Sequence, residues 1–481
     1  MHAVVYETVI GLEVHAQLLT KTKLFCSDET EFGAEPNTHI SPVTLGYPGT
    51  LPVLNKQAVR LAVKMGLACH SEIESVNYFA RKNYFYPDLP KGYQISQHTT
   101  PVCKGGYVTI RQEESDKKIQ LNRIHLEEDA GKSIHDKELD FTCLDFNRAG
   151  VPLIEIVTEP CISSADEAVS FITNLRRILR YLEICDGNME EGSLRCDANV
   201  SIRRAGEKKL GTKVEIKNLN SIRNVKRAIE YEVNRMQELA DRNEPIIQQT
   251  RSFDAIKGST FSLRSKEEAN DYRYFPDPDL PPFEVTSEFL KSIEETIPAL
   301  PEQLIVRYME NYNLTRYDAE VITDDKETAD YFEALIQSTP SYKAAANWLL
   351  GPVKSHLNEQ GISISAFPLK PAVMASLIAL VEEGRVHFST ASSKIFPELV
   401  AGRATDPLQI AQNLNLIQTG DESLILDWVK QVMDKMPDKV MEYKKGKKGL
   451  LGLFVGEVKK ISKGKADPHL TNQLLIQNLE K

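Results

Sequence analysis

The sequence predicts an α+β protein in which a strand-rich N-terminal region precedes two helical regions. Short segments that alternate apolar with polar residues, such as 198–202 and 213–217, are typical of the first part of the chain. After Pro301 the apolar residues recur at helical spacing instead. A chain of 481 residues is also too long for one compact core. The expected domains span residues 1–294, 295–405 and 406–481.

The first region is expected to combine strands with two helices. Ser164 and Glu167 are spaced as a capping box, and apolar residues follow at helical spacing up to Leu182. A second helix, amphipathic and heavily charged, is expected over 221–239. The proline-rich stretch 276–282 cannot continue a helix and closes the region. Strands are expected at 10–18, 107–110, 124–128, 151–157, 198–202 and 213–217.

The remainder of the chain is predicted to be helical throughout. The sequence Thr405-Asp-Pro407 marks a boundary between the two helical regions, and Asp467-Pro468 opens a last helix. Most apolar residues here are interpreted as core residues. Earlier helices are expected around 304–312, 331–336, 344–350, 372–381 and 450–458.

Composition excludes several classes of protein. No run of 18 apolar residues occurs, and the N-terminus lacks a basic stretch followed by an apolar one. The sequence therefore predicts neither a membrane span nor a secretion signal. The seven cysteines contain no C-x-x-C pair, which favours reduced thiols in a cytoplasm over a disulfide scaffold.

Charge is unevenly distributed along the chain. The formal net charge of −10 would ordinarily argue against a nucleic-acid partner. Residues 441–481, however, hold nine lysines against four acidic residues. One interpretation is a solvated helical face. The other is a basic tail on which a phosphate backbone docks.

Two polar side chains, Glu13 and His15, stand in the apolar strand 10–18. A period of two places Glu13, His15 and Gln17 on one face and the aliphatic residues on the other. Alternate residues of a strand are about 6.5–7 Å apart, close enough to share one bound ion. The alternative is a strand with one ordinary solvated face.

Two further segments favour a bound cation. In 124–128, an extended backbone would place Glu128 on the buried face, with His125, Glu127 and Asp129 on the other. Glu155 interrupts the apolar run 151–157. A desolvated carboxylate costs several kcal/mol unless a cation or hydrogen bonds compensate. Carboxylate-rich sites suit Mg²⁺ better than zinc. The candidate metal ligands are Glu13, His15, Glu128 and Glu155.

A loop and two short motifs have features of phosphate, nucleotide or metal binding. Residues 81–96 hold aromatic rings, cations and prolines, which suits stacking on a base; a proline-fixed surface loop is the alternative. In 190–199, Asp197 and Asn199 share a face and could supply oxygen atoms to a second ion or to a ribose; an ordinary turn and strand is the alternative. The end of a P-loop is present at 131–133, but Leu126 occupies the position that requires glycine, so that motif is rejected.

These segments resemble the B subunit of the tRNA-dependent amidotransferases, the GatB family. The resemblance includes VIGLEVH at 9–15, HLEEDAGK at 125–132 and EEGSLRCDAN at 190–199. The matches occur in order over nearly the whole chain. The remaining segments are residues 32–37, 81–88, 217–221, 271–276 and 446–468.

The resemblance implies a cradle-shaped antiparallel domain, a helical domain and a small helical tail. It also implies an activity: ATP phosphorylates the side-chain carboxylate of Glu on tRNA(Gln) or Asp on tRNA(Asn), and ammonia from an amidase A subunit then displaces phosphate. A small C subunit completes the implied heterotrimer. The resemblance agrees with Mg²⁺ at the four candidate ligands. Weaker candidates for catalytic phosphate or metal contacts are Lys82, Arg195 and Asp197.

Another class of function is also compatible with the basic tail and the aromatic loop. The chain could be a non-catalytic scaffold that binds tRNA and presents it to a partner amidase. Only the catalytic interpretation gives a reason to bury Glu128 and Glu155 on apolar faces. The sequence cannot distinguish Glu-tRNA(Gln) from Asp-tRNA(Asn) as the substrate.

One departure from the family concerns zinc. Many members that the sequence resembles carry paired cysteines around residues 32–37, whereas here only Cys26 remains. Asp28, Ser41 and Thr44 stand where the other thiols would be. One thiol with such partners is unlike the Cys- and His-rich sets that hold structural zinc.

We therefore expect no structural zinc. Elemental analysis of the purified chain should find no stoichiometric zinc, because three of the expected thiolates are absent. One zinc ion per chain would show that this ligand set has been misinterpreted.

Overall fold

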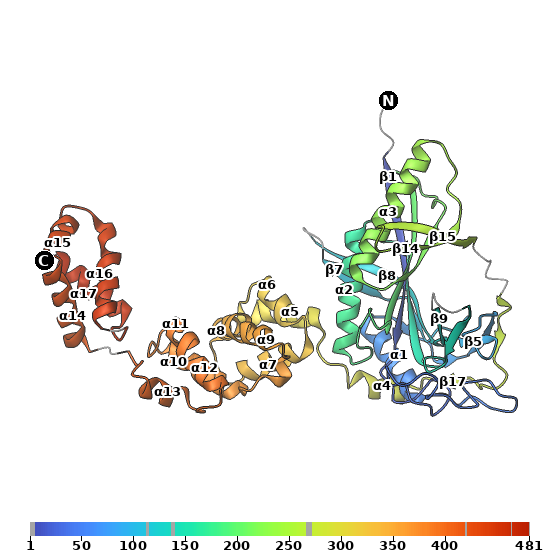
Figure 1. The fold of residues 1–481 in the computed structure, drawn as a ribbon, viewed down its shortest axis with the longest axis horizontal. Helices are drawn as coiled ribbons and strands as arrows, with labels where there is room; N and C mark the ends of the chain where they lie inside the picture. Colours follow the sequence, from blue (N-terminus) through green and yellow to red (C-terminus); the bar gives the residue numbers. More distant parts are fainter. Residues whose placement is uncertain are drawn as a thin grey trace. The chain divides into compact units, whose positions relative to one another are not determined.

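The computed structural model describes residues 5–111, 115–135, 140–265, 272–418, 421–462 and 464–480. It divides into two compact units, Met1–Pro301 and Glu302–Lys481. The first unit is a large sheet with helices and the second is helical (Figure 1), so the expected α+β class is confirmed. The domain boundaries near residues 294 and 405 stay a prediction. Asp271, in the segment 271–276, lies outside the described residues.

The described part of the first unit contains a thirteen-stranded sheet whose pairs are antiparallel except for β13 and β14. Its main path runs β15 (Ser259–Ser265), β14 (Gln249–Asp254), β13 (Val214–Leu219), β12 (Leu194–Arg204), β1 (Tyr6–Gln17), β11 (Pro152–Thr158), β8 (Asp116–Glu128), β5 (Tyr93–Ser96), β4 (Ala80–Asn83) and β16 (Phe275–Pro276). Off this path, β6 (Cys103–Lys104) and β7 (Tyr107–Arg111) pair with β8, and β2 (Glu72–Ile73) pairs with β6. Two small sheets join β9 (Lys132–His135) to β10 (Thr142–Asp145) and β3 (Val76–Asn77) to β17 (Phe283–Glu284).

Helices cover one face of this sheet. The apolar core lies between that face and the helices. They are α1 (Lys56–Ala68), α2 (Ala165–Tyr181), α3 (Ile222–Asp241) and α4 (Ser287–Glu294). The Ser164 hydroxyl accepts a hydrogen bond from the Glu167 amide at 3.1 Å, as the capping box predicts. Phe171 of α2 and Val225 of α3 are fully buried in the same apolar cluster as the inward residues of β1.

The alternation predicted for β1 decides which face carries chemistry. Leu12, Val14 and Ala16 are fully buried in the helix-covered core. Glu13 and His15 are only partly buried, on the opposite face. The sheet therefore has an apolar face under the helices and a polar face that is free to form a site.

The second unit is built of helices, and the predicted helical segments are confirmed. Its described elements are α5 (Pro301–Tyr312), α6 (Arg316–Ile322), α7 (Lys326–Ile336), α8 (Tyr342–Trp348), α9 (Lys354–Gln360), α10 (Pro371–Glu382), α11 (Phe388–Thr390), α12 (Phe396–Val400), α13 (Pro407–Asn413), α14 (Glu422–Lys435), α15 (Pro437–Lys444), α16 (Leu451–Ile461) and α17 (Pro468–Glu480). Phe454, Val458 and Leu475 belong to a separate buried cluster formed by the last four helices. Among the described residues, none of the helices has the length and apolar character needed to cross a membrane.

Candidate active site

A cavity of about 460 Å³ opens on the polar face at the middle of the sheet. Residues of β1, β4, β5, β8, β11, β12, β13 and β14 line it, together with Tyr272 and Tyr274 from the segment that precedes β16. A volume of this size lies within the range of small-ligand sites in proteins.

Strand register aligns the polar side chains of this cavity. His15 of β1 lies opposite Glu155 of β11, and Glu155 lies opposite His125 of β8. On the other side of β1, His15 faces Arg195 and Glu13 faces Asp197, both of β12. Directly opposed residues have Cβ atoms about 4.5–5.5 Å apart, so four strands bring their side chains into contact.

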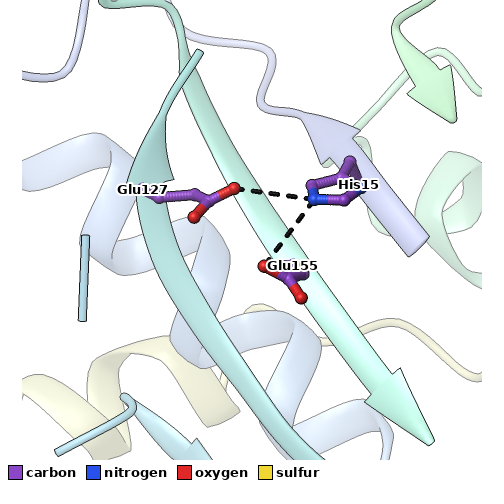
Figure 2. Close-up of side chains that lie close together, drawn as sticks. All are labelled: His15, Glu127 and Glu155. Carbon is purple, nitrogen blue, oxygen red and sulfur yellow. Dashed lines mark ion pairs between the residues drawn. The ribbon is translucent and has the colours of Figure 1, made fainter. Parts of the chain in front are cut away.

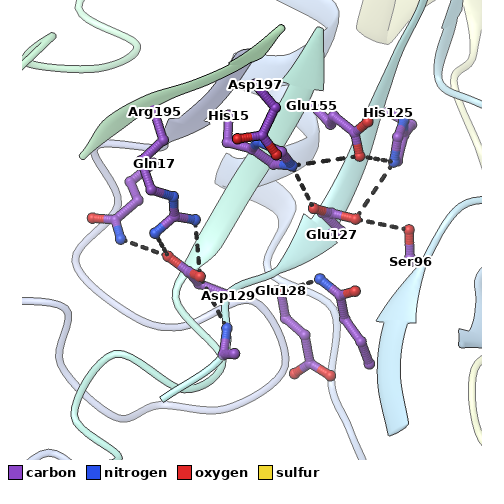
Figure 3. Close-up of polar contacts among 12 residues, drawn as sticks. His15, Gln17, Ser96, His125, Glu127, Glu128, Asp129, Glu155, Arg195 and Asp197 are labelled. Atoms are coloured by element: carbon purple, nitrogen blue, oxygen red, sulfur yellow. Dashed lines mark hydrogen bonds and ion pairs between the residues drawn. The ribbon is translucent and has the colours of Figure 1, made fainter. Parts of the chain in front are cut away.

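Two histidines and two carboxylates form the imidazole–carboxylate cluster, made of His15, His125, Glu127 and Glu155. The Nε2 atom of His15 lies 3.6 Å from a carboxylate oxygen of Glu127 and 3.6 Å from one of Glu155 (Figure 2). The Nε2 atom of His125 is 3.2 Å from Glu155 and 3.5 Å from Glu127. Each carboxylate is thus shared between two imidazoles (Figure 3).

The cluster holds its charges by mutual compensation. Burial lowers the pKa of His15, but the hydrogen bond and charge of Glu155 and the charge of Glu127 outweigh it and raise the pKa to about 9. The pKa of His125 is likewise raised to about 9, since the same carboxylates outweigh its burial. Burial raises the pKa of Glu155, but the two imidazoles bring it well below its usual value. The charged forms of all four groups are therefore favoured.

A second group of carboxylates, the acidic triad, comprises Glu13, Asp197 and Glu215. Its ligand oxygens lie within 4.8 Å of one another. The pKa of Glu13 is raised by burial and by the charges of Glu155, Glu215 and Asp197. Lys217 is the nearby cation, with its Nζ atom 3.5 Å from Glu215 and 3.9 Å from Asp197. The raised pKa of Glu13 reflects this concentration of negative charge.

Both groups fit hard divalent cations. Ligand atoms of His15, Glu127 and Glu155 also lie within 4.8 Å of one another. The donors are mainly carboxylate oxygens, which suit Mg²⁺, and the Nδ1 atom of buried His125 has no hydrogen-bond partner among the described residues. The polar face thus offers two carboxylate-rich groups inside one cavity.

The structure brings together three of the four residues predicted as metal ligands. Glu13, His15 and Glu155 line the cavity, but Glu128 does not. Glu128 points to the other face of the sheet (Figure 3), where its carboxylate accepts hydrogen bonds from Lys91 and from the Ile95 amide at 2.8 Å. There it lines a separate, smaller cavity with Lys23. Inclusion of Glu128 with the other three was wrong.

The physical reason is the register of β8 against β11. Alternation within β8 was predicted correctly, with Glu128 on the face of Ile124 and Leu126. Because His125 pairs with Glu155, however, the cavity face of β8 is that of His125 and Glu127. The predicted apolar surroundings of Glu155 were also wrong, since Glu155 faces polar groups in the cavity. The alternation His125-x-Glu127-x-Asp129, on the face opposite the apolar residues, was the signal that could have found Glu127.

The three residues predicted to make catalytic contacts also line the cavity, but their neighbours differ. Lys82 projects toward the imidazole–carboxylate cluster; burial lowers its pKa, but the carboxylate of Glu127 and other nearby groups outweigh this and leave the pKa raised. Asp197 belongs to the acidic triad. Arg195 is occupied, because its two terminal nitrogens each lie 3.0 Å from an oxygen of Asp129. Glu215 and Lys217, which the sequence patterns did not indicate, complete this side of the cavity.

The segment considered for zinc forms a hydrogen-bonded group. The Cys26 sulfur lies 3.4 Å from the Thr44 hydroxyl, which in turn donates to the Asp28 carboxylate. The Thr44 amide lies 3.5 Å from the Ser41 hydroxyl. Burial raises the pKa of the Cys26 thiol, which disfavours the thiolate that zinc requires. The absence of structural zinc stays a prediction.

Comparison with known proteins agrees with this geometry. A family model described as the GatB/GatE catalytic domain matches residues 8–291, and one described as the GatB domain matches residues 330–479. Three relatives carry the name of the B subunit of aspartyl/glutamyl-tRNA(Asn/Gln) amidotransferase. That of Thermodesulfovibrio yellowstonii is 49% identical over 477 residues, covering 99% of this chain and 100% of the relative. Those of Caldicellulosiruptor bescii (48% over 479 residues; 99% and 99% covered) and Persephonella marina (47% over 476 residues; 99% and 100% covered) are similar.

Every residue that lines the cavity lies within the part that matches the catalytic-domain model, so the cavity belongs to an enzyme domain. The chain belongs to the GatB family of amidotransferase subunits.

Asp129 provides a test of the electrostatics beside the cavity. Burial raises its pKa, but Arg195, Arg148 and a 2.8 Å hydrogen bond from Gln17 outweigh this, so the pKa is lowered. Asp129→Asn should destabilise the first unit by about 2–4 kcal/mol, because Arg195 is left buried without its partner. The folded-state pKa lies below the unfolded value, so this stabilisation is complete above about pH 4 and is lost as the pH falls through the folded pKa.

Denaturant unfolding from pH 8 to pH 2, followed by far-UV circular dichroism, measures the effect. The difference between the native protein and Asp129→Asn should be constant from pH 8 to pH 6 and should shrink at acid pH. Trp348 and Trp428 are the only tryptophans, and both lie in the second unit. Unfolding followed by tryptophan fluorescence is therefore an internal control, and its midpoint should be the same for the native protein and for Asp129→Asn at each pH. A difference that stays constant down to pH 2 would contradict the assignment.

Proposed function

We propose that this chain acts as the B subunit of an ATP-dependent, tRNA-dependent amidotransferase and that the cavity activates the side-chain carboxylate of the aminoacyl-tRNA. The observation that carries this proposal is the pair of carboxylate-rich groups in one cavity, with the ammonium of Lys82 beside them. A scaffold that only bound tRNA would have no use for such a concentration of partly desolvated acids.

The chemistry explains why ATP is needed. A carboxylate resists attack by ammonia because oxide would have to leave. In the proposed reaction a carboxylate oxygen attacks the γ-phosphorus of ATP, ADP leaves, and an acyl phosphate forms. Ammonia then attacks the carbonyl carbon, phosphate leaves, and a proton is lost to give the amide. The cavity must therefore offset the negative charge of the transferring phosphoryl group.

Residues of the cavity divide this task. His15, Glu127 and Glu155 would hold one Mg²⁺, and the acidic triad would hold a second. Bound Mg²⁺ supplies positive charge that neutralises phosphate oxygens. The Lys82 ammonium adds a further positive charge on the cavity wall. Arg195 is held by Asp129, so we assign it to positioning the end of β12 that carries Asp197.

The partners follow from the family and the surface charge. We infer a heterotrimer with an amidase A subunit and a small C subunit, acting in the cytoplasm on Glu-tRNA(Gln), Asp-tRNA(Asn) or both. In the basic tail, Lys447, Lys448 and Lys460 form ion pairs with acidic residues of the same region. Among the described residues, Lys444 and Lys445 have no ion-pair partner and are exposed, as phosphate contacts would require.

Glu155→Gln tests the cluster that we assign to metal binding. It removes a charged ligand with little change of shape and should abolish tRNA-dependent ATP hydrolysis by the complex, with circular dichroism unchanged. Amide formation at the native rate would remove Glu155 from the site.

The neighbours Glu127 and Glu128 offer a matched pair on one strand. Binding of Mn²⁺, a paramagnetic substitute for Mg²⁺, is measured by electron paramagnetic resonance on the complex without tRNA. Glu127→Gln should weaken Mn²⁺ binding about tenfold or more, because its carboxylate faces the cluster. Glu128→Gln should leave it within about twofold, because Glu128 faces the other side of the sheet. The reverse order would restore the ligand set predicted from the sequence.

The basic tail is tested by truncation. Removal of the chain from about Asp406 onward should weaken tRNA binding and flatten its salt dependence, because phosphate contacts release counterions. A milder variant, Lys444→Gln/Lys445→Gln, should reduce the salt slope by about 2 with the fold intact. Glutaminase activity of the A subunit without tRNA should be largely spared. Equal affinities and salt slopes would identify the lysines as solvated surface.

A further inference from the structure

We propose that residues 272–279, called the strap, position Lys82 by placing the ring of Tyr272 against its ammonium, so that Tyr272 and Tyr84 form an aromatic cage around it. The inference rests on the proposed function in one respect, namely that Lys82 faces the phosphoryl group. It adds a reason why a segment distant in sequence is part of the site.

Lys82 is held in an unusual way. Its Nζ atom lies 4.9 Å from the ring centroid of Tyr272 and 5.7 Å from that of Tyr84. Among the described residues the ammonium forms no hydrogen bond and no ion pair. A lysine side chain has several rotatable bonds, so its head group would sample many positions without a restraint. Cation–π contacts restrain an ammonium and leave its three donors available to a ligand.

The strap is fastened at both sides of Lys82. The guanidinium of Arg81, the preceding residue, donates to the buried carboxylate of Asp277 at 2.9 Å. The side-chain NH₂ group of Asn83, the following residue, donates to the Arg273 carbonyl at 2.9 Å. The neighbours of Lys82 in β4 therefore form hydrogen bonds with the strap, whereas the Lys82 ammonium contacts the rings of Tyr272 and Tyr84.

Backbone hydrogen bonds fix the register of the strap against β4. Phe275 pairs with Arg81 and Pro276 with Ala80, and the Asp277 amide donates to the Phe79 carbonyl at 2.9 Å. Arg273 adopts a left-handed conformation with φ +45°, which is unfavourable for a residue with a side chain. These contacts compensate for that cost.

The neighbouring ring has a different partner. Tyr274 also lines the cavity, but it stacks on His98 with ring centroids 4.1 Å apart and an interplanar angle of 7°. Tyr272 instead makes edge contacts with Tyr84 and Tyr274, at centroid distances of 6.0 Å and 6.2 Å. The rings thus form a continuous wall in which Tyr272 and Tyr84 lie against the ammonium.

A graded series at position 272 tests the cage in the assembled complex. Tyr272 is replaced by phenylalanine and by mono-, di- and trifluorophenylalanine, which keep the ring's shape and progressively weaken its attraction for a cation. Tyr272→Phe should keep tRNA-dependent ATP hydrolysis within about twofold. Across the fluorinated series the logarithm of kcat should fall steadily, by about 2- to 30-fold in total, with tRNA affinity unchanged. The kcat of Tyr272→Leu should be equal to or lower than that of the trifluorophenylalanine variant.

A matched control lies elsewhere in the same unit. The Lys118 ammonium lies 4.1 Å from the ring centroid of Tyr107, which takes no part in the cavity. The same series at position 107 should leave kcat unchanged.

The outcomes separate the two proposals. Native-level activity of Lys82→Met would overturn both the role of Lys82 and the cage. An inactive Lys82→Met together with a flat fluorination series at position 272 would overturn the cage alone. Equal losses at positions 107 and 272 would also overturn it, since they would show a general effect of fluorinated residues on the fold.

Discussion

The hydrogen-bonded register of four neighbouring strands, β12, β1, β11 and β8, is the constraint on which the site depends. It places Arg195, His15, Glu155 and His125 side by side, although they belong to separate segments of the chain. A slip of one residue in β11 would turn Glu155 into the apolar core and bring an isoleucine into the cavity. Burial of the opposite face under α1, α2 and α3 opposes any such slip, because it would expose the core residues of every strand involved.

Electrostatic balance follows from this arrangement. Glu127 and Glu155 can stay charged while largely buried because His15 and His125 each contact both of them. The acidic triad is built of three carboxylates, and the ammonium of Lys217 lies within 4 Å of two of them, Asp197 and Glu215. The cavity therefore combines one group that is neutralised by the protein with another that is short of positive charge. A site of this kind attracts divalent cations and, through them, phosphate.

The two faces of β8 divide the functions of adjacent carboxylates. Glu127 belongs to the cavity, whereas Glu128 pairs with Lys91 beside buried Lys23 on the other side of the sheet. Strand β4, next to the edge strand β16, contributes Lys82, and the strap brings aromatic rings to it from a later part of the chain. The residues of the proposed site thus come from six strands, from the segment after β4 that holds Tyr84, and from the strap. The sheet supplies their common frame.

Local sequence patterns were enough to predict the α+β class, most of the strands and helices, and the candidate site residues Glu13, His15 and Asp197. These depend on local period, capping and turn residues, which a single segment contains. Glu155 was found as a polar interruption and was grouped with His15, but its second histidine partner, His125, was not included in the predicted ligand set. Only the tertiary structure decided between Glu127 and Glu128, added Glu215 and Lys217 to the site, and placed Tyr272 beside Lys82. Each of those outcomes depends on how segments far apart in the sequence align, and alignment between strands is set by packing of the whole sheet rather than by any one strand.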